Sequence, residues 1–285
     1  MSEETFATPD LITYVVNYNK AVAGALAAEC GINVTEYCML AYLGDHVEAV
    51  KPATLAAIVG VSPAMITISA DKLLELKAIR RTGAKRSPLQ ITKVGVDLVR
   101  DADIVVAQTY EEYFSVLPAN LRAILDTGSV ATNTSSAAGN RMREGHFFAA
   151  FEILHAFLTV EYYLTNVSQI SGMSLGEFRI LFELDAQGVP LGPNELGAAL
   201  LLKPSTVSFA LRRLEQHGFI VRLPDPGDRR RSLVWFTDEG RAAFGNAFVA
   251  IENVFTTDIR PSVRTERDAY KDIAAYVVAS LRKRC

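Results

Sequence analysis

The stretch from Lys203 to Gly240 constrains the fold more than any other part of this chain. It reads KPSTVSFALRRLEQHGFIVRLPDPGDRRRSLVWFTDEG. Pro204 and the hydroxyls that follow it suit the start of a helix, and Gly218 suits its end. Between them the apolar residues Val207, Leu211 and Leu214 are spaced four and three apart, which places them on one face. The pattern predicts an amphipathic helix.

A hairpin is predicted directly after this helix. Phe219–Val221 and Leu233–Phe236 are two short apolar runs, and Asp225–Asp228 between them has the residues of a tight turn. Three arginines follow the turn. A helix beside such a hairpin is the layout of a winged helix, in which the helix enters the major groove of DNA and the hairpin tip reaches the backbone or the minor groove.

Each part of this layout has groups that suit DNA. The helix start offers free N–H groups and hydroxyl donors to phosphate, and the hairpin tip offers arginines to a narrow minor groove. A run of arginines alone more often marks a solvated face, so its position next to the helix is what favours DNA. We expect Asp228 to hold Arg230 in one rotamer. The predicted contacts are Lys203, Ser205, Thr206, Ser208, Phe209, Arg212, Arg213, Asp228, Arg229, Arg230 and Arg231.

Four spaced motifs in this stretch resemble the MarR (multiple antibiotic resistance) regulators. They are STVS at the helix start, RRLEQHGFIVR at its end, DPGDRRR at the turn and FTDEG after the second strand. The family has a basic residue at the position of Phe209. The resemblance implies a winged-helix transcription factor, most often a repressor, in which terminal helices pair two units so that two DNA half-sites are read. It also implies a cavity for a small aromatic effector, for which Tyr162, Tyr163, Phe178 and Phe182 are candidates, although plain core packing is the alternative.

The chain also contains an internal repeat. With an offset of 141, Asn33–Gly83 aligns without a gap to Ser174–Pro224, and ten of the 51 positions are identical. The identities are mostly apolar residues and prolines, which determine core faces and helix starts. Thr92 and Gly95 match Thr237 and Gly240 at an offset of 145, so the first hairpin is four residues shorter. The chain is therefore predicted to be two fused MarR-like units.

The predicted fold class is mainly α with small β-hairpin wings. Tandem winged helix-turn-helix units are joined through a helical region of the dimerisation type, as an intramolecular pseudo-dimer. The units are placed at residues 1–130 and 146–285, with a linker rich in small polar residues at 131–145. Whether such a chain stays a monomer or forms a homodimer is left open.

The first copy departs from the DNA-binding pattern. Its helix starts Pro63-Ala64-Met65-Ile66-Thr67, with few groups that could bond to base edges. Arg81, Lys85 and Arg86 still form a basic cluster with Arg80. We therefore expect the second unit to read sequence and the first to supply electrostatic grip. The alternative is a protein-interaction module built from degenerate winged helices, with no DNA binding.

Charge and composition limit the functions and cellular locations that this chain can have. The net charge of −3 means that any DNA contact depends on a local patch. The first ten residues show no secretory signal, Pro52–Ala70 is too polar for a membrane span, and three cysteines without metal spacing suit a reducing compartment. We expect a cytoplasmic protein that binds double-stranded DNA, with no catalytic or metal site and no cofactor. Cys30 and Cys38 are expected to be small buried residues.

Overall fold

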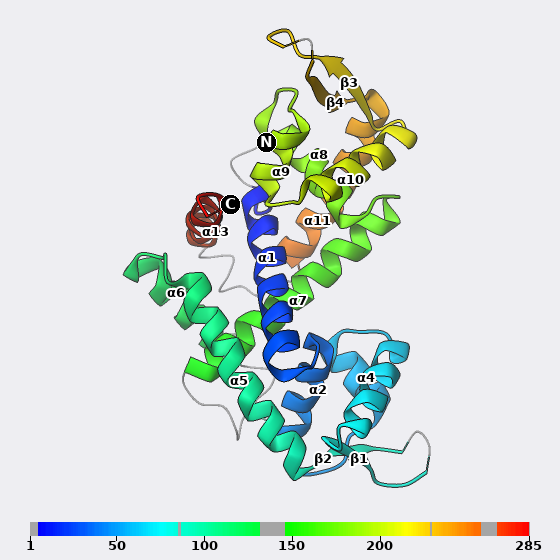
Figure 1. Cartoon of the computed structure of the whole chain (residues 1–285), viewed down its shortest axis with the longest axis vertical. Coiled ribbons are helices and arrows are strands. Elements are labelled where there is room, and N and C mark those ends of the chain that lie inside the picture. Colours follow the sequence, from blue (N-terminus) through cyan, green and yellow to red (C-terminus); the bar gives the residue numbers. More distant parts are fainter. Residues whose placement is uncertain (1–4, 85–86, 132–145, 229, 258–266, 285) are drawn as a thin grey trace. The chain divides into compact units, whose positions relative to one another are not determined.

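The computed structural model describes residues 5–84, 87–131, 146–228, 230–257 and 267–284. The chain is mainly helical and carries two small antiparallel hairpins (Figure 1). This confirms the predicted fold class of helices with small β-hairpin wings. The predicted linker lies almost wholly at 132–145, outside the described residues, and the pseudo-dimer arrangement stays a prediction.

The first half begins with α1 (Pro9–Ala25), which continues as a π-helical turn, η1 (Leu26–Cys30). Asn33 caps the next helix in a capping box with Glu36, and Ser62 caps the helix that follows the left-handed Gly60. The other elements are α2 (Val34–Asp45), α3 (Pro52–Val59), α4 (Pro63–Glu75), β1 (Ile79–Arg81), β2 (Leu89–Ile91), α5 (Lys93–Phe114) and α6 (Ala119–Ala131).

The second half repeats this order after a long helix, α7 (His146–Ile170). The helix that follows α7 starts with a capping box formed by Ser174 and Glu177 and ends at the left-handed Gly188. The remaining elements are α8 (Leu175–Gln187), α9 (Pro193–Leu200), α10 (Pro204–Gln216), β3 (Ile220–Pro224), β4 (Ser232–Phe236), α11 (Asp238–Thr257) and α13 (Arg267–Arg282).

The two hairpins differ in length, but each is joined by one further β-bridge to a residue that lies before it in the chain. The register of β1 and β2 runs from Ile79 opposite Ile91 to Arg81 opposite Leu89, whereas β3 and β4 pair over five positions. A single bridge joins Val50 to Leu89 in the first half, and Leu191 to Val234 in the second. These bridges correspond to each other at the offsets of 141 and 145.

One ion pair also recurs at equivalent positions of the repeat. The buried Glu36 carboxylate, besides capping α2, lies 2.9 Å from Lys72 Nζ on α4. The equivalent carboxylate of Glu177 caps α8 and lies 2.8 Å from Arg213 Nε on α10. In each half a cation, on α4 or on α10, therefore binds the start of α2 or of α8.

The helix after each hairpin starts against the backbone just before the first strand of that hairpin. Thr92 Oγ1 donates to the Ala78 carbonyl and accepts from Gly95, while Thr237 Oγ1 donates to the Gly218 carbonyl and accepts from Gly240. A Cβ on Gly95 would lie 2.1 Å from the Ala78 carbonyl oxygen, and one on Gly240 would lie 1.8 Å from that of Phe219. Only glycine fits such close approaches, which explains why the sequence repeats Thr and Gly at this spacing.

The structure separates into two compact units. The C-terminal unit comprises the described parts of residues 1–17, 116–125 and 160–285, and the N-terminal unit those of 18–115 and 126–159. Aromatic side chains form much of each core: Tyr18, Tyr110 and Phe114 in the N-terminal unit, and Phe178, Phe182 and Phe244 in the C-terminal unit. The predicted domain boundaries at residues 130 and 146 stay a prediction.

No single helix among the described residues has the length and apolar composition of a membrane span. Helices α3 and α4 have that length and composition only when taken together, and the pair is bent by 112°.

Candidate nucleic-acid interface

Helix α10 has one buried face and one exposed polar face. Val207, Ala210, Leu211 and Leu214 are buried, as the spacing of the apolar residues predicted. The opposite face exposes the predicted contact residues Ser205, Thr206, Ser208, Phe209 and Arg212. Phe209 is 60% exposed, an unusual position for a phenylalanine in a folded domain. This face is free for a ligand of the C-terminal unit.

The start of α10 has no side-chain cap. Lys203 is the N-cap residue and makes no side-chain cap, whereas Ser62 caps the equivalent helix α4 by accepting from the Met65 N–H at 3.3 Å. Pro204 has no N–H and the Thr206 N–H donates to the Lys203 carbonyl at 2.9 Å, so the first turn offers mainly the positive end of the helix dipole and the Ser205 N–H. Lys203 adds a full positive charge at the same place.

The two neighbouring arginines of α10 have different environments. Arg212 lies on the exposed face. Arg213 is half-buried, and its guanidinium lies against the buried Glu177 carboxylate. The structure therefore separates two residues that sequence reasoning treated alike. Glu177 was missed as the partner, although its match to Glu36 in the repeat was a signal.

The turn of the hairpin is held by its aspartates. Asp225 Oδ1 accepts from the Gly227 N–H at 2.8 Å, and the Asp228 carbonyl accepts from the Arg231 N–H at 2.9 Å. Arg231 Nη2 lies 3.3 Å from Glu195 Oε1 on α9, and its Nη1 lies 3.8 Å from Asp225 Oδ2. The hairpin tip is thus connected to α9 through Arg231.

The expected hold of Asp228 on Arg230 takes another form. Asp228 Oδ1 accepts from the backbone N–H of Arg230 at 2.9 Å, so the aspartate shapes the turn and leaves the guanidinium alone. Of the two described arginines that directly follow the turn, it is Arg231 whose guanidinium lies near carboxylates. Within the part of the chain that the structure describes, the Arg230 side chain is exposed and has no ion-pair partner. Arg229 lies outside the described residues.

The exposed face of α4 in the N-terminal unit differs from that of α10 in its residue types. Helix α4 exposes Met65, Ile68 and Asp71, where α10 has Thr206, Phe209 and Arg212. Arg81 Nη2 lies 3.3 Å from Asp71 Oδ1, and Arg80 donates to the Gln90 side chain at 2.8 Å. Both arginines are thus engaged by neighbours, and Lys85 and Arg86 lie outside the described residues.

The four candidate effector residues lie in different environments. Phe178 and Phe182 are fully buried on α8, with ring centroids 5.7 Å apart. Tyr162 and Tyr163 on α7 are both exposed and contact each other edge to face. The structure joins them as two pairs, and an effector site stays a prediction.

No group of three or more metal-ligating side chains occurs among the described residues. Cys38 is buried and Cys30 half-buried. Burial, with smaller contributions from Asp101 and Glu29, raises the pKa of the Cys30 thiol.

Comparison with known proteins gives a family for part of the chain. Residues 173–232 match the model of the MarR family. The HTH-type transcriptional regulator PecS of Dickeya dadantii (strain 3937) is 38% identical over 87 residues, which are 30% of this chain and 52% of PecS. The uncharacterized HTH-type transcriptional regulator YkoM of Bacillus subtilis (strain 168) is 34% identical over 85 residues, 30% of this chain and 54% of YkoM. The chain thus spans about half the length of these relatives.

Two solved structures each match less than half of the chain. Wild-type MarR from E. coli in its apo form has a TM-score of 0.37 at 22% identity, over 40% of this chain and 88% of that one. The transcriptional repressor CouR bound to a 23-mer DNA duplex has a TM-score of 0.37 at 27% identity, over 43% and 86%. The family match, in contrast, covers α8, α9, α10 and the hairpin up to the start of β4. This chain therefore contains a MarR family domain, located in its C-terminal unit.

Proposed function

We propose that this chain is a cytoplasmic transcriptional regulator, acting as a repressor, whose C-terminal unit binds double-stranded DNA in a sequence-specific way. Helix α10 enters the major groove, and the β3–β4 hairpin follows the backbone or the minor groove. The observation that carries the proposal is the exposed face of α10, where Ser205, Thr206, Ser208, Phe209 and Arg212 lie opposite a fully apolar buried face. The relatives named above are themselves HTH-type transcriptional regulators.

The charges of the interface support this function. Arg213, Arg222 and Arg231 each have a carboxylate partner. Among the described residues of α10 and its hairpin, Lys203, Arg212 and Arg230 have none, and all three are exposed. Cations that are exposed and unpaired give the largest gain when they meet phosphate, because they lose no internal ion pair. Hydroxyls and Phe209 on the same helix provide contacts to base edges and thymine methyl groups.

The test is selection of a duplex by the wild-type protein from a random-sequence pool, followed by gel-shift titration against that duplex and sheared genomic DNA. Arg212→Ala and Arg230→Ala should each weaken binding to the selected duplex by about 10-fold or more, the effect of roughly 1.4 kcal/mol or more per contact. Arg284→Ala, at an exposed position two residues beyond α13, removes the same charge and should leave binding unchanged. If the pool yields no enriched sequence, the proposed function is wrong.

For the N-terminal unit we propose an accessory role, which is to supply electrostatic grip, meaning binding to DNA phosphates without regard to sequence. The residues that would do this are Arg80, Arg81, Lys85 and Arg86. Asp71 reduces this grip, because it occupies the face position of Arg212 and lies beside Arg81. Asp71→Arg should therefore tighten binding to both the selected duplex and genomic DNA. A change in only the first of these affinities would contradict a role without sequence readout.

A second candidate function, a protein-interaction surface, is favoured at α4 by its exposed side chains. Met65, Ile68 and Leu76 are 43%, 64% and 43% exposed, beside the carboxylates of Asp71 and Glu75. Exposed apolar residues grouped on one helix are typical of surfaces that bind other proteins. Ile68→Ser should leave the affinity for DNA unchanged if α4 serves a protein partner, and should lower it if α4 enters a groove.

Release by a small aromatic effector and the number of chains in the active species are further parts of the proposal. Exposed Tyr162 and Tyr163 would contact such an effector. A thermal-shift screen of phenolic acids should find compounds that raise Tm in the wild type and not in Tyr162→Ala. Sedimentation at micromolar concentration distinguishes a monomeric pseudo-dimer from a homodimer of tandem chains.

A further inference from the structure

The turn between α9 and α10 is held from outside by two arginines. The last carbonyl groups of a helix have no partner within it and carry its negative dipole end. Arg282 on α13 donates to the Ala199 carbonyl from Nε at 3.0 Å and from Nη2 at 2.6 Å. Arg179 on α8 donates to the Leu200 carbonyl at 2.7 Å. These arginines therefore cap α9 directly before the turn that leads into α10.

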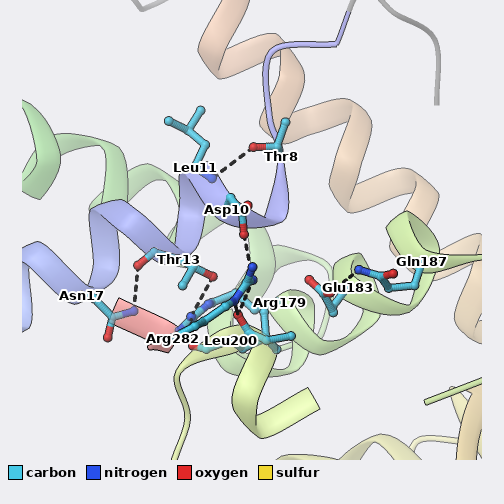
Figure 2. A network of polar contacts seen from close by, with 11 residues as sticks. Thr8, Asp10, Leu11, Thr13, Asn17, Arg179, Glu183, Gln187, Leu200 and Arg282 are labelled. Carbon is cyan, nitrogen blue, oxygen red and sulfur yellow. Dashed lines mark hydrogen bonds and ion pairs between the residues drawn. The ribbon is translucent and has the colours of Figure 1, made fainter. Parts of the chain in front are cut away.

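The same two arginines also bind α1. Arg282 Nη2 lies 2.8 Å from Asp10 Oδ1, and Arg179 Nη2 donates to Thr13 Oγ1 at 3.1 Å (Figure 2). Arg179 is 3% exposed and Thr13 is fully buried. A guanidinium has a rigid planar fork, so one that bonds two elements fixes their distance and orientation. Asp10, Thr13, Arg179 and Arg282 are called the arginine brace below.

The α1 end of the brace is itself fixed. Thr8 Oγ1 accepts from the Leu11 N–H at 3.1 Å and so caps the first turn of α1 (Figure 2). Just before it, the backbone N–H groups of Phe6 and Ala7 donate to the Glu252 carboxylate on α11 at 3.1 and 2.5 Å. Residues some 190 positions before α10 in the sequence are thus held in the same compact unit as α10.

The turn that the brace holds is short and contains a residue with an unfavourable backbone conformation. Leu201, the C-cap of α9, has a left-handed backbone with φ of 53°, which is unfavourable for a residue other than glycine. Only Leu202 and Lys203 separate it from α10, and Lys203 makes no side-chain cap. A residue in this conformation persists when its surroundings hold it there, and the brace bonds the two carbonyls immediately before it.

We propose that the arginine brace sets the position of the α9–α10 turn, so that the start of α1 controls how α10 is presented to DNA. Asp10 and Thr13 are positioning residues, which act through Arg282 and Arg179. This inference rests on the proposed function for its DNA readout. Its structural part, that the brace keeps the α9–α10 turn ordered, can be tested without DNA.

Asp10 gives the sharpest test, because the brace and simple electrostatics predict opposite results. Asp10→Ala removes a negative charge, which by long-range electrostatics should tighten binding to every duplex. The brace predicts that Asp10→Ala weakens binding to the selected duplex by about 10-fold, the size of a lost hydrogen bond to a charged group. Binding to genomic DNA should stay the same or become tighter. Asp10→Asn keeps an acceptor for Arg282 and should restore most of the specific binding.

The experiment compares full-length wild type, Asp10→Ala, Asp10→Asn, Arg282→Ala and the double variant Asp10→Ala/Arg282→Ala. Lys283→Ala, one position further along the chain and exposed, is the matched control for the charge lost with Arg282. The first readout is amide hydrogen exchange without DNA over 201–208, where the Leu202 N–H donates to the Gly197 carbonyl and the Val207 N–H to that of Lys203. The second is the ratio of affinities for the selected duplex and for genomic DNA.

The brace predicts exchange at least several-fold faster over 201–208 in Asp10→Ala and Arg282→Ala, with α8 unchanged. It also predicts that exchange in the double variant is no faster than in the more severe single variant, because the two single substitutions remove the same link between Asp10 and Arg282. Unchanged exchange at the turn overturns the proposal, as does a uniform rise that includes α8, since that reports lost stability. If the wild type selects no duplex, the proposed function fails, while hydrogen exchange still decides whether the brace orders the turn.

Discussion

At the scale of single residues, Asp10 links the brace to pH. Burial raises the pKa of the Asp10 carboxyl, and the nearby Arg282 guanidinium, which lowers it, offsets only part of this effect. Between the unfolded pKa and the higher native pKa, the folded state binds a proton that the unfolded state does not. The free energy of unfolding contributed by this group therefore falls as the pH rises through that window.

The first prediction follows from that sign. Asp10→Asn cannot titrate, so as the pH rises from 3.8 toward the higher native pKa of Asp10 its free energy of unfolding should rise more steeply with pH, or fall less, than that of the wild type. At pH 7.5 Asp10→Asn should be no less stable than the wild type, because it removes a buried charge and keeps an acceptor for Arg282. Urea titrations at several pH values measure both. A variant that is markedly less stable at pH 7.5 would show that ionised Asp10 stabilises the fold.

The second prediction concerns the thiols. Burial raises the pKa of the Cys30 thiol, and Cys38 is buried away from reagents, so both should react slowly at pH 7.5. In a Cys285→Ser background, a thiol reagent such as DTNB should label neither residue within minutes in the native protein, and both in denaturant. Rapid labelling of Cys30 would show that its thiol is accessible and reactive.

At the scale of elements, the glycines after each hairpin determine how the wing is seated. Gly240→Ala would place a Cβ 1.8 Å from the Phe219 carbonyl oxygen, so the start of α11 must move away from β3. We expect a loss of about 1 to 3 kcal/mol in the free energy of unfolding, as for other overpacked sites. Gly95→Ala should cost a similar amount in the N-terminal unit.

Gly245→Ala is the matched control for this third prediction. Gly245 lies within α11, and a Cβ there would meet no atom within 4 Å. The substitution should stabilise the helix by up to about 1 kcal/mol, since alanine is the better helix former. Thermal unfolding of the three variants measures the effects. Equal results for Gly240→Ala and Gly245→Ala would show that the close approach to Phe219 is not a constraint.

The helices and hairpins were largely predictable because their signals are local. Pro63 and Pro204 mark helix starts, Gly188 and Gly218 mark ends, and the apolar spacing of α10 identifies its buried face. The partners of the arginines were not predictable in the same way. The links of Arg213 to Glu177 and of Arg231 to Glu195 join elements that only the tertiary fold brings together. Glu177 alone had a signal, its match to Glu36.

At the scale of the whole molecule, the arginine brace was out of reach of sequence reasoning for the same reason. Asp10 and Arg282 are 272 positions apart, and neither belongs to a motif. The repeat predicts two similar units with α1 in the first, but the start of α1 belongs to the C-terminal unit. Because the repeat describes each unit alone, it has no information on elements that the two halves exchange.

The fourth prediction concerns how the two halves share DNA. Arg230→Glu in the C-terminal unit should lower the affinity for the selected duplex more than that for genomic DNA. Arg86→Glu in the N-terminal unit should lower both affinities by the same factor. Both variants should make binding less dependent on salt, because a complex with fewer phosphate contacts releases fewer counterions when it forms. The slope of log K against log salt concentration should change by about 0.9 for each lost contact. Gel-shift titrations at several salt concentrations measure all three quantities.

Selectivity and salt dependence separate the two roles, because a contact to phosphate alone has a salt slope but no sequence preference. Asp71 opposite Arg212, Ile68 opposite Phe209 and Met65 opposite Thr206 leave α4 with few groups that read bases. The N-terminal unit can then contribute charge from its wing but not discrimination. If Arg86→Glu reduced the preference for the selected duplex more than Arg230→Glu, α10 and its hairpin would not be the sequence-reading elements, and the assignment of the two units would have to be reversed.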